Sequence, residues 1–125
     1  MTQEDKELLL KDLCARLPYN VRIRHYVNDI DFYSNPLMTY DIDQLKNNKA
    51  IIKPYLRPML SMTEEEKKEH DFYCGYKPYD KNSGESYLTE YDMQDYMDWL
   101  NAHHFDYRKL IEKGLAIEAP KEMYK

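Results

Sequence analysis

The sequence predicts an α+β fold in which an N-terminal amphipathic helix leads into a small antiparallel β-meander and C-terminal helices complete the chain. Three observations predict this order: leucines recur at helical spacing near the N-terminus, apolar and polar residues alternate in the middle, and helical spacing returns in the final third. The chain has 125 residues and no linker-like stretch, so we expect residues 1–125 to form a single domain.

The first predicted element is a helix from Glu4 to Leu17. Thr2 is suited to be its N-cap, and Pro18 ends it. Four leucines fall on one face of this helix, namely Leu9, Leu10, Leu13 and Leu17. We expect that face to be buried, with Cys14 on or beside it. The residues expected to lie away from it are Glu4, Asp12, Ala15 and Arg16.

A β-meander is predicted next because the periodicity changes from helical to alternating. The clearest strand runs from Val21 to Val27, with one side formed by Val21, Ile23, His25 and Val27. Two further strands are predicted at 37–42 and 49–53. Turn-forming residues separate the three strands: Asn28-Asp29, Ser34-Asn35-Pro36 and Asn47-Asn48. Pro54 and Pro58 then predict an extended segment that runs along the surface.

Helices are predicted again after residue 60. Thr63 and Glu66 have the spacing of a capping box, which predicts a short helix over 64–72. The polar stretch 75–86 is predicted to be an exposed loop. Thr89 is suited to cap a second helix over 90–103, whose apolar face is expected to pack on the N-terminal helix through Met93, Tyr96, Met97 and Leu100. A last short helix is predicted over 106–113, with Gly114 as its left-handed terminal residue and a short strand over 115–117.

Composition and charge exclude several classes of protein. The net charge is −5 and the sequence pI is about 5.4, which does not favour direct binding to nucleic acid. The longest aliphatic run, Leu8–Leu10, is far too short to span a membrane, and the acidic N-terminus is not a signal peptide. Without a membrane span or a signal peptide we expect a cytoplasmic location. In that compartment Cys14 and Cys74 are expected to be free thiols, with a disulfide between them as the less favoured alternative.

Metal and cofactor motifs are weak in this sequence. The segment 80–85 is similar to a calcium-binding loop, but Tyr91 stands at the twelfth position, where that loop needs a carboxylate. Other potential ligands form two separate pairs, His70 with Cys74 and His103 with His104. Zinc needs three or four converging ligands, so two pairs do not define a site, although either pair could join one in space. We predict no metal site and no cofactor, and we expect His104 to be a packed core histidine.

The helix predicted over 90–103 carries the candidate partner-binding residues. They are acids at every third position with aromatic neighbours: Tyr91, Asp92, Asp95, Asp98 and Trp99. Three interpretations stay open, namely a solvated helix face, a face that binds a protein partner, and carboxylates paired for catalysis. Trp99 stands at the edge of the apolar stripe, where it is either a lid on the core or an interface anchor. A nearby aromatic run would also indicate a partner if it is exposed: Phe72, Tyr73, Tyr76 and Tyr79.

Several stretches of the sequence carry a resemblance to a known group of proteins. They read DKELLLKDLCARLPY at 5–19, KPYLRPM at 53–59, SMTEEE at 61–66, DWLNAHHFDYR at 98–108 and GLAIEAP at 114–120. In these stretches the chain resembles small uncharacterised proteins of gut Bacteroides, often found in prophage or other mobile regions. That group has no established activity. The resemblance therefore implies a bacterial cytoplasmic setting and a phage-related role, and it assigns no functional residue.

The sequence contains no glycine-rich phosphate loop, no nucleophile elbow and no reactive-cysteine motif, so an enzyme is not favoured. Our leading hypothesis is a non-catalytic protein-interaction module that binds a protein partner or forms a homo-oligomer, without direct contact to nucleic acid or a membrane. One alternative is an acidic phage-type inhibitor that acts as a decoy for a DNA-binding protein. Another is a small metal-dependent hydrolase, which would need His or Cys to meet Asp or Glu in a pocket.

Overall fold

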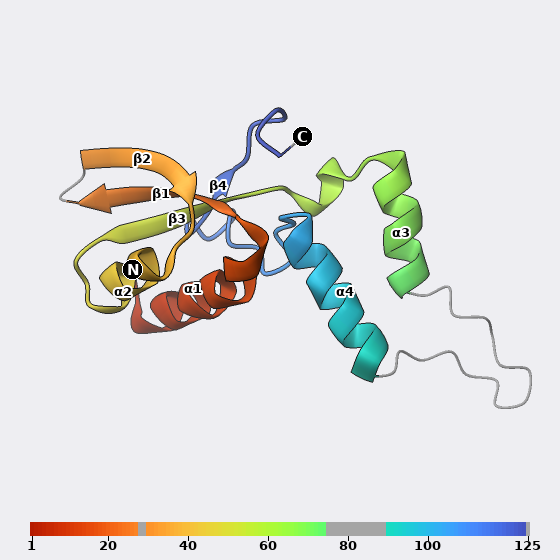
Figure 1. Ribbon diagram of the computed structural model, residues 1–125, viewed down its shortest axis with the longest axis horizontal. Coiled ribbons are helices and arrows are strands. Elements are labelled where there is room, and N and C mark those ends of the chain that lie inside the picture. Colours follow the sequence, from red (N-terminus) through yellow and green to blue (C-terminus); the bar gives the residue numbers. More distant parts are fainter. Residues whose placement is uncertain (28–29, 75–89, 125) are drawn as a thin grey trace, which may run out of the picture.

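The computed structural model describes residues 1–27, 30–74 and 90–124, and within them it confirms the α+β fold (Figure 1). The helices are α1 (Gln3–Arg16), α2 (Thr39–Lys46), α3 (Glu64–Cys74) and α4 (Glu90–Ala102). The strands are β1 (Arg22–Val27), β2 (Ile30–Pro36), β3 (Ile51–Leu56) and β4 (Ile117–Glu118). Short 3-10 turns span Leu17–Tyr19 and Met59–Ser61. No helix in the described ranges is long and apolar enough to cross a membrane.

The strands form one sheet in the order β2-β1-β3-β4. β1 lies in the middle of three antiparallel strands, because it pairs with β2 on one side and with β3 on the other. β4 joins β3 in parallel. Three antiparallel strands are present as predicted, but the second is β2 at 30–36 and not the predicted segment 37–42. The prediction of a meander is wrong, because β3 does not follow β2 in the sheet and instead pairs with the far side of β1.

The main core lies between this sheet and the helices α1 and α2, which lie below the strands in Figure 1. Fully buried aliphatic side chains come from α1 (Leu9 and Leu13), β1 (Ile23), α2 (Leu45) and β3 (Ile52). β3 continues through Pro54 to Leu56 and is buried at that end. The proline segment is therefore extended, as predicted, but it is not a surface segment.

Local sequence signals are confirmed where the partner groups are close in the chain. The hydroxyl of Thr2 accepts a hydrogen bond from the N–H of Asp5 at 3.1 Å and caps α1. The Thr63–Glu66 capping box is complete, with the two reciprocal bonds at 3.0 and 3.1 Å. Asn48 has a φ of 58°, as a turn residue after α2 can have.

The prediction of a strand over 37–42 is wrong, because α2 begins at Thr39. The carboxylate of Asp41 accepts a hydrogen bond from the N–H of Met38 at 2.9 Å and fixes the start of this helix. The same carboxylate lies 2.8 Å from Nδ1 of the buried His25 on β1. The residues Ser34-Asn35-Pro36, predicted as a turn, belong to β2, whereas Asn28-Asp29 lie outside the described residues.

The prediction that the polar side of α1 faces solvent is wrong for two of its residues. Asp12 and Arg16 are fully buried and joined by a 2.8 Å ion pair. Arg16 also donates a hydrogen bond to the carbonyl of Phe105 at 2.6 Å. Arg108 donates a hydrogen bond to the carboxylate of Asp12 at 3.1 Å. A segment that is distant in sequence thus covers this side of the helix. Cys14, expected on or beside the apolar face, is exposed.

No helix forms over 106–113, contrary to the prediction, and the chain instead makes a series of turns. Lys109 interrupts any helix because its φ is 60°. Asp106 nevertheless acts as a cap, since its carboxylate accepts hydrogen bonds from the N–H groups of Leu110 and Ile111 at 2.8 and 3.0 Å. Gly114 has the left-handed conformation expected for it, with a φ of 73°.

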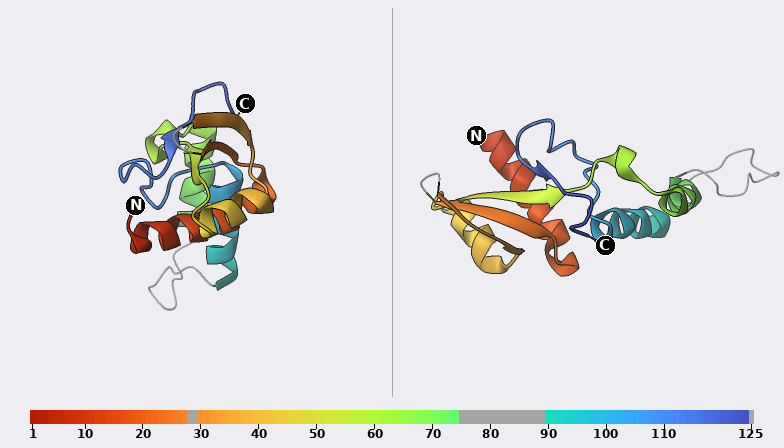
Figure 2. Two further views of the ribbon diagram at one scale, coloured as in Figure 1. Left: turned by 90° about the vertical axis from the view of Figure 1, so that its left-hand side faces the viewer. Right: turned by 90° about the horizontal axis from the view of Figure 1, so that it is seen from above.

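The pair of α3 and α4 lies at the end of the long axis opposite to α2 and to the strands β1 and β2, as Figures 1 and 2 show. These helices pack on each other around a second hydrophobic cluster, which contains the buried residues Trp99, Leu100 and Phe105. Met97 packs in this second cluster and Met93 is 46% exposed. The prediction that the methionines of α4 pack on the N-terminal helix is therefore wrong, although α4 still contacts α1.

Candidate functional site

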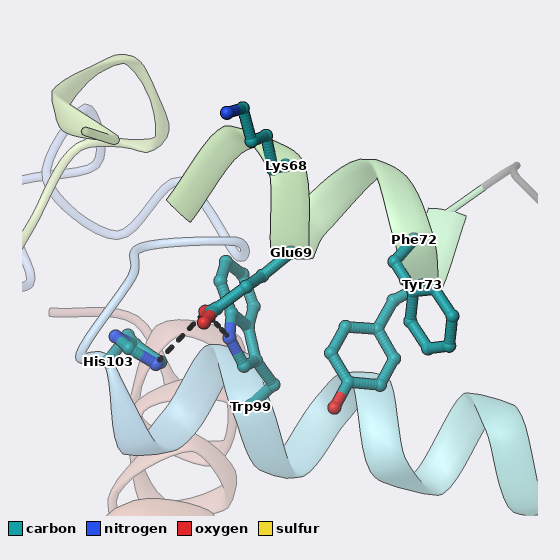
Figure 3. Close-up of a pocket in the computed structure, with 6 residues that line it drawn as sticks. All are labelled: Lys68, Glu69, Phe72, Tyr73, Trp99 and His103. Atoms are coloured by element: carbon teal, nitrogen blue, oxygen red, sulfur yellow. Dashed lines mark hydrogen bonds and ion pairs between the residues drawn. The ribbon is translucent and has the colours of Figure 1, made fainter. Parts of the chain in front are cut away.

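A hollow of about 430 Å³ opens between α3 and α4 (Figure 3). Its walls come from Lys68, Glu69, Phe72 and Tyr73 on α3, and from Trp99 and His103 at the end of α4. Aromatic rings therefore form most of its surface, and one carboxylate lies among them.

Helical spacing brings the wall residues together. On α3, positions three or four apart fall on the same side, so Glu69 and Tyr73 face α4. Trp99 lies on α4 and His103 directly follows the helix, four positions later, and both face α3. His70 adds a further cross-link, because its Nε2 lies 3.0 Å from the hydroxyl of Tyr96.

Trp99 is the centre of the aromatic wall. It is 9% exposed, and its ring lies 4.8 Å from His103, 5.5 Å from Phe105 and 6.0 Å from Tyr73. Its indole N–H donates a hydrogen bond to Oε2 of Glu69 at 2.8 Å. The structure thus places this tryptophan in the second core, where its ring also lines the hollow.

A charged pair lies next to the hollow and fixes the start of α3. The guanidinium of Arg57 donates two hydrogen bonds to the carboxylate of Glu66, at 2.6 and 2.7 Å, and lies over the ring of Phe105 at 4.4 Å. These bonds lower the pKa of Glu66 to about 2 despite its burial. Nδ1 of His103 lies 3.1 Å from the same carboxylate, so the histidine is oriented by a permanent negative charge.

The other predicted partner-binding residues lie further along α4. Asp95 is exposed, and Asp98 is half-buried and accepts a hydrogen bond from Gln94 at 2.9 Å. The pKa of Tyr19 is raised, first by burial and then by the nearby carboxylate of Asp98. Tyr91 and Asp92 belong to α4, but their side chains lie outside the described residues. An exposed acid and a bonded acid do not form the buried carboxylate pair that acid–base catalysis requires.

In the described part of the chain, the potential metal ligands do not converge. Among the described side chains, no group of three or more His, Cys, Asp and Glu residues could hold a metal ion. His104 is buried as expected and stacks on Tyr124 at 3.8 Å, while burial and the charge of Arg16 lower its pKa to about 4. The side chain of Cys74 and the calcium-like segment 80–85 lie outside the described residues.

The sequence indicated part of this site. Phe72 is 64% exposed and Tyr73 lines the hollow, as a partner-binding aromatic run would require, while Tyr76 and Tyr79 lie outside the described residues. The role of Glu69 was missed, because its partner Trp99 is 30 residues away in the chain. The signal that could have found it is the repeat of acids at 66 and 69, three positions apart on the side of α3 that carries Tyr73.

Charge is distributed unevenly between the helix pair and the rest of the protein. α3 and α4 together contain nine of the 23 acidic residues of the chain but only two of its 18 lysines and arginines. α4 contains no basic residue at all. The hollow therefore lies in the most negatively charged part of the protein, where a cationic ligand is attracted.

No protein-family model, no curated protein and no solved structure matches this chain.

Proposed function

We propose that this protein is a non-catalytic interaction module whose α3–α4 pair binds a basic surface of a protein partner. The observation that carries the proposal is the charge of the two helices, which hold nine acids against two lysines. Complementary charge accelerates encounter between proteins and selects against acidic partners.

Exposed apolar side chains on or next to the same two helices also support the proposal that this surface binds a partner. Leu60, in the turn before α3, is 97% exposed, and Phe72 of α3 and Met93 of α4 are 64% and 46% exposed. Large apolar side chains among acids are typical of a surface that is covered when a partner binds. Salt alone would screen a purely electrostatic contact, whereas these residues supply area that binding removes from water.

The setting proposed for this function is the cytoplasm of a bacterium, in a phage-derived or other mobile context. It is supported by the resemblance in the stretches at 5–19, 53–66 and 98–120 and by the composition of the chain. A second candidate function is an acidic decoy for a DNA-binding protein. The absence of basic residues from α4 favours it, since four acids on one helix can compete with phosphates for a basic groove.

Charge reversal on the surface of α4 tests the proposal. Immobilised wild-type protein is used to isolate partners from a bacterial lysate, and each retained protein is then purified and titrated by calorimetry. We expect Asp95→Lys to abolish binding of a basic partner, because Asp95 is exposed on α4. The matched control is Glu112→Lys, which reverses an exposed charge outside the two helices and should bind as the wild type does.

Two results would contradict the proposal. One is that every purified partner binds the Asp95→Lys variant as tightly as the wild type. The other is that the partners are acidic proteins whose binding does not weaken with added salt.

A further inference from the structure

We propose that the hollow between α3 and α4 binds a single arginine side chain of the protein partner, which stacks on Trp99 and pairs with Glu69. This inference rests on the proposed function, because it names the group on the basic partner that the helix pair recognises.

The protein itself contains an arginine bound in this manner. Arg57 lies over the ring of Phe105, with 4.4 Å between Cζ and the ring centroid, and its two terminal nitrogens donate to Glu66 at 2.6 and 2.7 Å. A planar guanidinium is suited to both contacts at once, because its face stacks on an aromatic ring while its edge donates to a carboxylate.

Glu69 and Trp99 repeat two parts of that arrangement in the hollow. Glu69 follows Glu66 by three positions, about one turn further along the same side of α3. The ring of Trp99 lies 5.5 Å from that of Phe105, so the two aromatic rings are neighbours as well. The hydrogen bond from the indole N–H holds the carboxylate of Glu69 next to Trp99, so one carboxylate and one aromatic ring lie together here too.

The carboxylate in the hollow is accessible, unlike the inner one. The side chain of Glu69 is 55% exposed, against 12% for Glu66. In the described part of the chain only Oε2 of Glu69 has a partner within hydrogen-bond distance, which leaves Oε1 for a donor that enters from outside. A partner's guanidinium can therefore pair with Glu69 without breaking the bond to Trp99.

The remaining walls suit an organic cation. Tyr73 and Phe72 add aromatic surface on the side of α3, and the ring of Tyr73 lies 6.0 Å from that of Trp99. Lys68 is the one lysine or arginine among the described residues that line the hollow, and Figure 3 shows its ammonium group pointing away from Glu69 and Trp99. Nε2 of His103 lies 4.0 Å from Oε2 of Glu69, the oxygen that already accepts from the indole. The ammonium group of Lys68 therefore does not fill the part of the hollow that lies beside Glu69 and Trp99.

The test uses the single tryptophan of the chain as the reporter. The indole N–H signal of Trp99 is followed by NMR while the full chain is titrated with three capped tripeptides, acetyl-Gly-Xaa-Gly-amide, at constant ionic strength. Xaa is arginine, lysine or citrulline, which has nearly the shape of arginine without its charge. We expect a saturable shift with arginine, a weaker response with lysine and none with citrulline.

Glu69→Gln is the decisive variant, because its amide oxygen can still accept the indole hydrogen bond while its charge is lost. We expect it to weaken arginine binding about tenfold. The control Glu65→Gln removes an exposed charge from the same helix outside the hollow and should leave binding within about twofold of the wild type.

The possible failures separate this inference from the function on which it rests. Equal shifts with arginine and citrulline, or equal arginine binding by wild type and Glu69→Gln, would overturn the arginine pocket. If the basic partner then still binds the wild type and loses affinity with Asp95→Lys, the docking surface stands without the pocket. If neither peptide nor basic partner binds, both proposals are rejected.

Discussion

Loss of the charge on Glu66 should destabilise the protein in a way that depends on pH. The pKa of this carboxyl is lowered from 4.5 to about 2, chiefly by the hydrogen bonds from Arg57. A shift of that size corresponds to about 3 kcal/mol at neutral pH. Because the side chains of the pair remain 19% and 12% exposed, solvent screens part of this interaction, and we expect Glu66→Gln to lower the free energy of unfolding by about 2 kcal/mol.

The sign of the pH dependence follows from the direction of the shift. The folded protein holds this carboxylate ionised at a pH where the unfolded chain already takes up a proton. The stabilisation is therefore complete above pH 4.5 and is lost as the pH falls towards 2. The difference in stability between wild type and Glu66→Gln should be largest at neutral pH and should shrink across that range.

Urea unfolding followed by the fluorescence of Trp99 measures this difference at a series of pH values. The glutamine oxygen can still accept the N–H of Thr63, so the capping box is kept. The amide NH2 cannot accept the second hydrogen bond from Arg57, so the charge and that bond are removed together. Glu65→Gln is the matched control, because this neighbour is exposed and should change stability by less than about 0.5 kcal/mol. A loss for Glu66→Gln below about 1 kcal/mol at neutral pH, or one that is constant with pH, would refute the reasoning.

Three further substitutions or titrations test other parts of the structure. Arg16→Met should cost about 3–5 kcal/mol in urea unfolding, because it leaves the carboxylate of Asp12 buried without its main counter-ion; a loss below about 1 kcal/mol would contradict the buried pair. Gly114→Ala should cost about 1 kcal/mol from backbone strain alone, since its φ is 73° and nothing lies within 4 Å of an added Cβ; a neutral result in the same assay would contradict the left-handed turn. The ring protons of His104 should titrate in NMR spectra near pH 4, because burial lowers the pKa of this histidine. As the pH falls from 6.5 to 4, the free energy of unfolding should decrease, because the histidine takes up a proton there only in the unfolded chain. A titration midpoint near 6.5 would show that the histidine is not buried.

Elements fixed by nearby residues could be predicted from the sequence. α1 has its cap within three residues, and α3 has both members of its capping box within the same distance. β1 alternates strictly, and its inward residues Ile23 and His25 are buried. In these cases the information that decides the conformation lies inside the element itself.

Elements fixed by distant residues could not be predicted. The segment 37–42 alternates like a strand, yet the contact between Asp41 and His25 of β1 holds it as the start of a helix. Asp12 and Arg16 are polar and were assigned to the solvent, but the carbonyl of Phe105, 89 positions away, accepts a hydrogen bond from the buried arginine. Periodicity identifies apolar faces and cannot show which polar face another segment will cover.

The candidate site was predicted in part for the same reason. Trp99 and the exposed Phe72 could be predicted as candidates, because tryptophan and exposed aromatic residues are typical of interfaces. The hydrogen bond that joins Trp99 to Glu69 crosses between two helices, and no spacing rule relates two helices whose packing is unknown. The acids on α4 were predicted as partner-binding residues from the sequence. The acids on α3 become candidates only once the structure shows that α3 packs against α4.

Hydrogen–deuterium exchange of the protein with and without its purified partner tests the central claim most directly. We expect slower exchange in Glu64–Cys74 and Glu90–Ala102, because the partner covers the acidic helix pair. Slower exchange confined to the exposed apolar residues at the other end, around Met38, Tyr40 and Ile51, would contradict that claim.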